Sequence, residues 1–190
     1  MFKSNHPALI VIDTQLAIDH FDSGYRNNPG AEAAIAQLLD RWRQAQLPVV
    51  HIRHASKFSG SPYHPQSPYF EFKRETRPLA SEEVITKSEN CAFIGTELEA
   101  WLKDRGICEV VICGVLVNNS VDATVRVAAG LGYRVVVPHE ATAAFPLHRL
   151  DGKFVTAEDV HWIFLSNLAG EYAEVVSAKL VLQCTLAQSE

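Results

Sequence analysis

Three polar residues of different chemistry, Asp13, Lys87 and Ser120, each follow a short apolar run of the chain. The runs have the length and composition of buried β-strands. A carboxylate, an ammonium group and a hydroxyl group can together transfer protons and stabilise charge, which suits acid–base or nucleophilic catalysis. The carboxyl ends of strands in an open parallel sheet line a single crevice where ligands bind. We therefore expect the three side chains to meet in one pocket, although they lie far apart in the sequence.

The stretch around Ser120 predicts a sharp turn from a strand into a helix. Gly114 ends an apolar run, and the asparagines that follow tolerate the backbone angles of a tight turn. From Val121 onward the apolar residues recur at helical spacing. Ser120 then lies at the positive, N-terminal end of the helix, a place that suits a nucleophile or a group that binds an oxyanion. Simple helix capping by Ser120 is the alternative.

Apolar runs alternate with segments of helical periodicity along the whole chain. This alternation is typical of a parallel sheet whose two faces are covered by helices. We therefore expect one domain, residues 1–190, of the α/β class, with three layers (α/β/α) and a six-stranded, mainly parallel sheet. Residues 53–80 have no such periodicity and are rich in serine, proline and aromatic residues, so we expect an ordered loop that covers a pocket or a subunit contact. The expected strands are residues 8–12, 48–52, 83–86, 110–113, 135–137 and 180–182.

The composition is that of an ordinary globular protein and argues against several classes of partner. The 190 residues are enough for one domain with a sizeable core, and 47% of them are hydrophobic. A net charge of −5 argues against nucleic acid or an anionic membrane as partner, and no apolar run is long enough to span a bilayer. The N-terminal residues lack the pattern of a signal peptide, and the four cysteines lack metal-type spacing. We expect a cytoplasmic protein with free thiols.

Several segments are similar to those of one known family. The sequence from Gly114 through Ser120 to Thr124 resembles the nucleophile segment of the isochorismatase-like cysteine hydrolases, in which a cysteine stands where this chain has serine. ALIVIDTQ, at residues 8–15, and VITKSENCAF, at residues 84–93, resemble the segments that carry the family's catalytic aspartate and lysine. The resemblance covers nearly the whole chain and implies the family's Rossmann-like α/β/α fold.

The resemblance implies roles for individual residues. Asp13 and Lys87 match the catalytic pair, and Ser120 takes the place of the nucleophile. A cis peptide bond is implied between Val115 and Leu116, and backbone N–H groups near Leu116 and Ser120 would bind an oxyanion. A substrate pocket is expected beside these positions. Its expected lining residues are Gln15, Phe21, Phe93 and Asn119.

The implied activity is hydrolysis of a small molecule, at a vinyl ether or at the C–N bond of an amide or imide. A serine hydroxyl is much harder to ionise than a thiol, so nucleophilic attack by Ser120 is not favoured. A second route needs no nucleophile on the protein: Asp13 protonates the enol carbon of a vinyl ether, and water completes the hydrolysis. The alternative from a different class is a catalytically silent family member that binds a ligand or a partner. Members of the family commonly assemble, so we expect a homo-oligomer, a dimer or larger.

Two histidines, one in the second expected strand and one just after it, raise the question of a metal site. Some amidases of the family use an aspartate and histidines there, but in this chain only Arg53 and Ile52 separate His51 from His54, and neither is acidic. We therefore expect no metal and, without a glycine-rich phosphate loop, no cofactor. Cys91 is expected to pack as a small buried hydrophobic residue.

Overall fold

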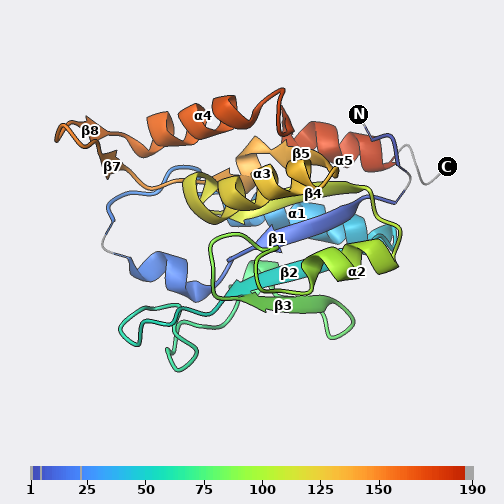
Figure 1. Ribbon diagram of the computed structural model, residues 1–190, viewed down its shortest axis with the longest axis horizontal. Helices are drawn as coiled ribbons and strands as arrows, with labels where there is room; N and C mark the ends of the chain where they lie inside the picture. Colours follow the sequence, from blue (N-terminus) through green and yellow to red (C-terminus); the bar gives the residue numbers. More distant parts are fainter. Residues whose placement is uncertain (1, 5, 22, 187–190) are drawn as a thin grey trace.

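A twisted, parallel β-sheet forms the centre of the computed structural model, which describes residues 2–4, 6–21 and 23–186 (Figure 1). Within these residues the sheet has seven strands, and its spatial order is β3-β2-β1-β4-β5-β9 with the short strand β6 beside β4. Every strand pair in this sheet is parallel. The strands are β1 (Ala8–Ile12), β2 (Val49–His54), β3 (Glu83–Lys87), β4 (Glu109–Val115), β5 (Arg134–Pro138), β6 (Thr142–Ala143) and β9 (Glu174–Val176).

The chain winds outward from the middle of the sheet in both directions. β1, β2 and β3 lie in sequence order toward one edge, and the chain then returns to place β4 on the other side of β1. β5 and β9 continue toward the opposite edge. The winding therefore reverses between β1 and β4, and the crevice at the carboxyl ends of such a pair is the usual place for a ligand.

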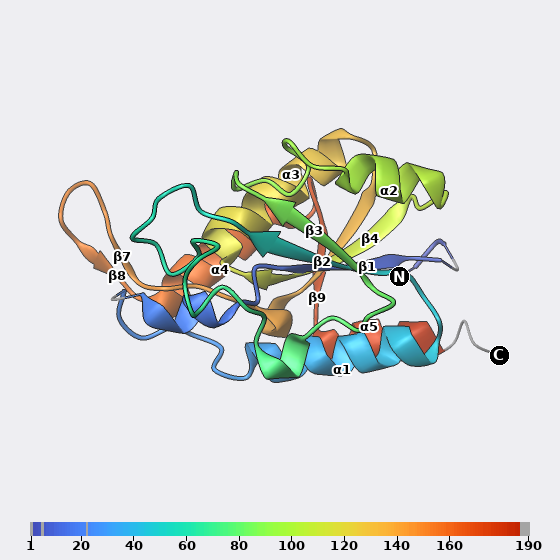
Figure 2. The ribbon, with the colours of Figure 1, turned by 90° about the horizontal axis from the view of Figure 1, so that it is seen from below.

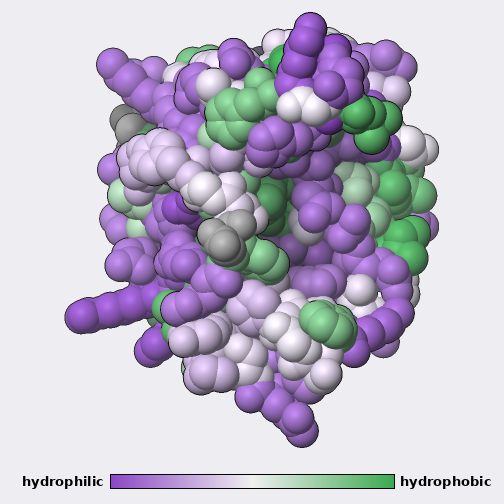
Figure 3. Space-filling view, turned by 90° about the vertical axis from the view of Figure 1, so that its left-hand side faces the viewer, coloured by the Kyte–Doolittle hydropathy of each residue, from purple (hydrophilic) through white to green (hydrophobic). Residues whose placement is uncertain are grey.

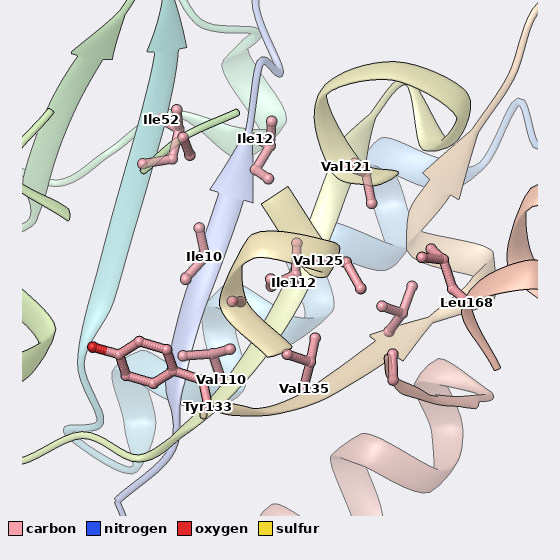
Figure 4. Close-up of a cluster of buried hydrophobic side chains, with 14 of the residues drawn as sticks. Ile10, Ile12, Ile52, Val110, Ile112, Val121, Val125, Tyr133, Val135 and Leu168 are labelled. Atoms are coloured by element: carbon pink, nitrogen blue, oxygen red, sulfur yellow. The ribbon is translucent and has the colours of Figure 1, made fainter. Parts of the chain in front are cut away.

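Alternate residues of β1 point to opposite faces of the sheet, and helices cover both faces. Ile10 and Ile12 pack in the core beneath α2, α3 and α4, part of which Figure 4 shows. Leu9 and Val11 pack on the other face against α1 and α5, which lie side by side in Figure 2. All of these side chains are fully buried, which explains why β1 is a continuous apolar run. The helices are α1 (Ala31–Gln44), α2 (Leu98–Asp104), α3 (Asp122–Gly130), α4 (Ala157–Leu168) and α5 (Ala178–Leu186).

Short turns and one hairpin complete the described part of the chain. β7 (Leu147–His148) and β8 (Phe154–Val155) form an antiparallel hairpin that projects beyond the end of α4 (Figure 1). Of the described helices, none has both the length and the apolar character that a membrane crossing requires. The helical turns are η1 (Leu16–His20), η2 (Arg74–Thr76), η3 (Val117–Val121) and η4 (His139–Ala141).

The α/β class and the mainly parallel sheet between helices agree with the prediction. The described sheet has seven strands rather than six, because the two-residue strand β6 pairs with β4, and the last expected strand is wrong. Residues 180–182 lie in α5, where Val181 is fully buried in the core shared with α1, and the edge strand is β9 instead. A run of three apolar residues does not distinguish a strand from one turn of an amphipathic helix. Ser177 carried the missing signal, because its Oγ accepts a hydrogen bond from the N–H of Leu180 at the start of the helix.

β4 approaches β1 closely at Gly114, where no larger residue fits. Gly114 has a φ angle of +122°, and a Cβ atom there would lie 2.1 Å from the carbonyl oxygen of Ile12. The obstructing atom belongs to the backbone of a central strand, so it cannot move aside without disturbing the sheet. Ile12 and Gly114 are partners in the register between the two strands. The glycine therefore permits the spacing of the strands at the edge where Asp13 follows.

We predict that Gly114→Ala lowers the free energy of unfolding by about 3 kcal/mol or more, because it combines a strained φ angle with a backbone overlap. Denaturant-induced unfolding measures the change. Gly130→Ala is the matched control: it ends α3, and an added Cβ would meet nothing within 4 Å. It is expected to be neutral or to stabilise the protein by up to about 1 kcal/mol. Equal stability of Gly114→Ala and the wild type would contradict the steric argument.

Candidate active site

The carboxyl ends of three strands bring together the polar residues that the sequence singles out. Asp13 follows β1, Lys87 is the last residue of β3, and Ser120 lies in the turn η3 after β4. The Nζ atom of Lys87 lies 2.8 Å from Oδ2 of Asp13 and 3.2 Å from Oγ of Ser120. A carboxylate, an ammonium group and a hydroxyl group thus form one hydrogen-bonded cluster.

Strand spacing explains why a long side chain is needed in this cluster. β2 lies between β1 and β3, so the backbone of Lys87 starts about 10 Å from the strand that leads to Asp13. Its partner in the register of β2 is His54, the last residue of that strand. Asp13 has a φ angle of +53°, so the chain turns out of β1 directly at the carboxylate. The short side chain of Asp13 therefore follows the central strand β1, and the long side chain of Lys87 reaches it from β3, two strands away.

Burial controls the charges in this cluster. The exposed fractions of Asp13 and Lys87 are 4% and 1%, so neither charge is stable there without the other. Burial raises the pKa of the Asp13 carboxyl above its ordinary value, while the Lys87 ammonium and the Ser120 hydroxyl act in the opposite direction. Lys87 also donates to the carbonyl of Glu89 at 3.2 Å. Oδ1 of Asp13 is itself buried and has no hydrogen-bond partner among the described residues.

Thr124 joins the turn that carries Ser120 to the segment that follows β3. Its hydroxyl donates to the carbonyl of Ser120 at 2.7 Å and accepts from the N–H of Ala92 at 3.0 Å. Thr124 is fully buried, so both hydrogen bonds are shielded from water. Thr124 therefore links the turn that carries Ser120 to the segment that follows Lys87.

A pocket of about 210 Å³ opens beside these side chains. Figure 3 shows that the face at which the strands end is hollowed near its centre, with hydrophobic side chains in the hollow. The loop between β2 and β3 contributes Tyr63, whose hydroxyl donates to the carbonyl of Asp13 at 3.3 Å. The long aromatic loop thus covers a pocket, one of the two roles expected of it. The lining residues are Asp13, Ile18, Phe21, Ser23, His54, Ser61, Tyr63, Asn90, Val115, Leu116, Asn119, Ser120 and Phe145.

Some residues expected around the substrate lie at this pocket. Phe21 and Asn119 line it, as do Val115 and Leu116, the pair expected at a cis peptide bond. The peptide bond between Val115 and Leu116 is cis. These four residues come from the segment after β1 and from the end of β4, which meet at the reversal point of the sheet.

Two residues expected in the pocket lie outside it. Gln15 is fully buried, and its side chain forms hydrogen bonds with the backbone of His54 and the carbonyl of Phe70. The ring of Phe93 stacks on Tyr133, with 6.0 Å between ring centroids, and packs against the core beneath α2 and α3. Gln15 therefore holds the surrounding backbone, and the partly buried Phe93 packs on the edge of the core.

Sequence reasoning missed several lining residues. The sequence suggests His54 only as a metal ligand, although its position two residues after an expected strand is also a signal for a site residue. Tyr63 belongs to a loop whose aromatic content already indicated a covering role. Ile18, Asn90 and Phe145 carry no local signal, because only the folded chain brings their segments to the pocket.

Both candidate histidines, His51 and His54, lie within β2, and they do not form a metal site with other described residues. The described part of the chain contains no group of three or more His, Cys, Asp or Glu side chains that could hold a metal ion. Nε2 of His51 lies 3.0 Å from Glu82, whereas His54 lines the pocket. Cys91 is buried and is not among the lining residues.

Comparison with known proteins points to one family. A family model described as "Isochorismatase domain" matches residues 7–179. The isochorismatase family protein YrdC of Bacillus subtilis is 36% identical over 170 residues, which cover 90% of this chain and 91% of that protein. Streptothricin hydrolase of Streptomyces noursei is 36% identical over 169 residues, which cover 87% of this chain and 64% of that protein. A crystal structure of an isochorismatase-family protein from Chromobacterium violaceum has a TM-score of 0.95 and 42% identity, covering 98% of this chain and 96% of the other.

We predict that Lys87→Met lowers the free energy of unfolding by about 3–5 kcal/mol at pH 8, because it leaves the Asp13 carboxylate buried without its counter-charge. The loss should shrink as the pH falls. A folded-state pKa raised above the unfolded value means that the native state holds a proton which the unfolded state releases, so stability decreases as pH rises through that window. Chemical unfolding at several pH values measures both effects.

A double variant separates the charge effect from loss of packing. Asp13→Asn combined with Lys87→Met has no buried charge, so it should be more stable at pH 8 than Lys87→Met alone. Lys57→Met is the matched control, because Lys57 forms only an exposed ion pair with Glu89 and its loss should leave stability nearly unchanged. Equal losses at pH 5 and pH 8 for Lys87→Met would show that the charge pair is not the cause.

Proposed function

This chain belongs to the isochorismatase family and is a hydrolase of that family, and we propose that it hydrolyses a small molecule through proton transfer by Asp13. The bond that is cleaved is a vinyl ether or the C–N bond of an amide or imide. Lys87 sets the charge of Asp13, and Ser120 orients water or substrate. The observation that carries the proposal is the position of Lys87 Nζ, within hydrogen-bond distance of both Asp13 Oδ2 and Ser120 Oγ.

The surroundings of Asp13 support its role as the proton-transferring group. Burial raises the pKa of its carboxyl, so Asp13 binds the proton that a general acid needs more readily than an exposed aspartate does, although Lys87 acts in the opposite direction. Asp13 lines the pocket, and its Oδ1 has no partner among the described residues. The carboxyl can therefore exchange a proton with a molecule in the pocket while Oδ2 stays bonded to Lys87.

The same contacts argue against Ser120 as the attacking group. Its Oγ accepts a hydrogen bond from Lys87, which occupies one oxygen lone pair. Lys87 donates to Asp13, Ser120 and the Glu89 carbonyl, which uses all three hydrogens of an ammonium group and leaves its nitrogen no lone pair to take the hydroxyl proton. Water is therefore the nucleophile in this proposal.

For a vinyl ether the proposed reaction begins with carbon protonation. Asp13 donates its proton to the terminal enol carbon, and the substrate becomes an oxocarbenium ion beside the new carboxylate. Water held by Ser120 adds to the cationic carbon and returns a proton to Asp13. The resulting hemiketal collapses to a carbonyl compound and an alcohol, so one water is consumed and Asp13 ends protonated.

Cleavage of a C–N bond is the second candidate, and two asparagines favour it. Asn90 and Asn119 line the pocket, and their side-chain amides have no hydrogen-bond partner among the described residues. An asparagine side chain offers one acceptor and two donor hydrogens, which match the groups of an amide. In this route ionised Asp13 takes a proton from attacking water and passes it to the leaving nitrogen. Backbone N–H groups of Leu116 and Ser120 are the proposed oxyanion donors.

We further propose that residues 1–190 form one catalytic domain that works as a cytoplasmic homo-oligomer. The family match over residues 7–179 supports the single domain. All four cysteines are free, which supports a reducing compartment. Light scattering coupled to size-exclusion chromatography tests the assembly, and a mass equal to one chain would contradict it.

We predict that Asp13→Asn lowers kcat/KM at least about 100-fold on any substrate found in a panel of vinyl ethers, amides and imides, because it removes the proton-transferring group. The pH profile identifies the route. If Asp13 protonates carbon, activity is lost as pH rises through its pKa; if it activates water, activity is lost as pH falls through that pKa. Asp151→Asn, an exposed carboxylate between β7 and β8, is the matched control. Full activity of Asp13→Asn would reject both routes.

We predict that Ser120→Ala lowers kcat/KM less than about tenfold, the effect of losing one hydrogen bond of about 1 kcal/mol. An attacking serine would instead lose nearly all activity on substitution, because nucleophile and base act as a unit. Ser59→Ala, in the covering loop, is the control for a lost hydroxyl. Mass spectrometry of wild-type enzyme with substrate gives the decisive contrary result, since an acyl group on Ser120 would reject the water route.

We predict that Ser120→Cys gains hydrolysis of amides that the wild type does not cleave. The thiol ionises far more readily than the hydroxyl, and Lys87 already lies beside this position to stabilise a thiolate. Turnover of the amide panel and alkylation of the new thiol by iodoacetamide measure the gain. A thiol that alkylates no faster than free cysteine would contradict the expected activation.

A further inference from the structure

His54 lines the pocket but has no part in the proposed reaction. It is the last residue of β2 and stands opposite Lys87 in the register of β2 and β3. Its Nδ1 atom lies 3.4 Å from Nζ of Lys87. The imidazole is therefore in contact with the group that also bonds Asp13 and Ser120.

The contact with Lys87 determines which imidazole nitrogen carries the proton. Lys87 has three donor hydrogens and four neighbours, of which Nδ1 of His54 is the most distant, so Nδ1 shares a hydrogen with another acceptor. An ammonium group repels a ring N–H, so Nδ1 presents its lone pair to Lys87. In a neutral imidazole the proton then lies on Nε2. Nε2 has no hydrogen-bond partner among the described residues. Nδ1 of His54 thus contacts Lys87, whereas the Nε2–H group has no partner among the described residues.

A buried glutamine holds the backbone of His54 in place. Oε1 of Gln15 accepts from the His54 N–H at 2.8 Å, and Nε2 of Gln15 donates to the His54 carbonyl at 3.1 Å. The same Nε2 donates to the carbonyl of Phe70 in the covering loop at 2.8 Å. The imidazole also meets the ring of Tyr63 edge to face, with 5.5 Å between centroids. The position of His54 is therefore fixed by its backbone and by one face of its ring.

We propose that His54 is a substrate-binding residue whose Nε2–H donates a hydrogen bond to an uncharged oxygen of the substrate, a carbonyl or ether oxygen. This inference rests on the proposed function of the same pocket. No arginine or lysine is among the lining residues, and Lys87 is already paired with Asp13, so the pocket offers no free cation to a carboxylate group. A neutral donor beside two asparagine amides suits an uncharged polar group instead.

The charged groups around the ring keep the imidazole neutral. Burial and the Lys87 ammonium lower the pKa of His54, while the carboxylates of Asp13 and Glu89 oppose this shift. Tyr63 faces the ring from the covering loop, and burial raises the pKa of its phenol well above the ordinary value, so it stays uncharged. Protonation of Nδ1 at low pH would set two cations against each other and break the contact with Lys87.

Nitrogen NMR of the histidine side chains tests the tautomer without any substrate. In full-length wild-type protein at pH 7.5, the two-bond 1H–15N pattern of His54 should be that of the Nε2–H form, with His54→Gln used to assign its signals. Lys87→Met should relax this preference toward a mixture of tautomers. An Nδ1–H tautomer in the wild type would overturn the inference. The tautomer is measured without substrate, so a negative result for the proposed hydrolysis would not change it.

Kinetics on a substrate found in the panel test the hydrogen bond itself. His54→Asn has no donor at the position of Nε2 and should lower kcat/KM about 10- to 100-fold. His54→Gln can place its amide nitrogen near that position and should recover most of the loss.

The pH dependence of kcat/KM gives a second test. Wild-type activity should fall below the pKa of His54, and this loss at low pH should be absent in His54→Gln. His148→Gln, an exposed histidine in the hairpin, is the matched control. Activity of His54→Asn within twofold of wild type, with unchanged thermal stability, would overturn the inference.

Discussion

Two opposite charges lie out of water at the carboxyl edge of the sheet, on Asp13 and Lys87, and each is stable there only because the other lies 2.8 Å away. The pair cannot form unless β1, β2 and β3 are neighbours in the correct register, because Lys87 must reach across β2. On the other side of β1, Gly114 allows β4 to lie close to β1, because a side chain there would overlap the carbonyl oxygen of Ile12. The close packing of the central strands is thus a condition for the charge cluster.

Lys87 determines the chemical state of its neighbours through the number and kind of its contacts. It donates to Asp13, Ser120 and the Glu89 carbonyl, and it faces Nδ1 of His54. Since an ammonium group accepts nothing, each of these groups must present a lone pair to it. The serine oxygen is thereby less available for attack, and the histidine is directed to carry its proton on the far side of the ring.

A second group of charges, in which Lys73 and Glu32 are buried and Asp19 is exposed, joins the segments that cover the pocket. Lys73, in the loop between β2 and β3 just before η2, lies 2.7 Å from carboxylate oxygens of both Asp19 in η1 and Glu32 in α1, and Arg26 lies 2.7 Å from Glu32. Burial alone would raise the pKa of Glu32, but its bonds with Arg26 and Lys73 lower that pKa to about 2. Glu32 therefore stays charged across the physiological range, and the ion pairs join the loop, η1 and α1. Ion pairs of Lys73 thus join the segments around the pocket, whereas Gln15 holds the backbone of His54 and Phe70 by hydrogen bonds.

The sequence by itself determined the class of fold and the local setting of three polar residues, because both depend on short-range patterns. Continuous apolar runs identify buried parallel strands, and a polar residue just after such a run is near the carboxyl edge of the sheet. The same short-range reasoning mistook one turn of α5 for a strand, since three apolar residues have no measurable period. The tertiary structure decided what depends on contacts between distant segments. Gln15 and His54 lie 39 residues apart, so only the paired strands and the covering loop could turn an expected pocket residue into a support for the histidine. The proton position on His54 is likewise set by Lys87 on a neighbouring strand, a contact that no local pattern encodes.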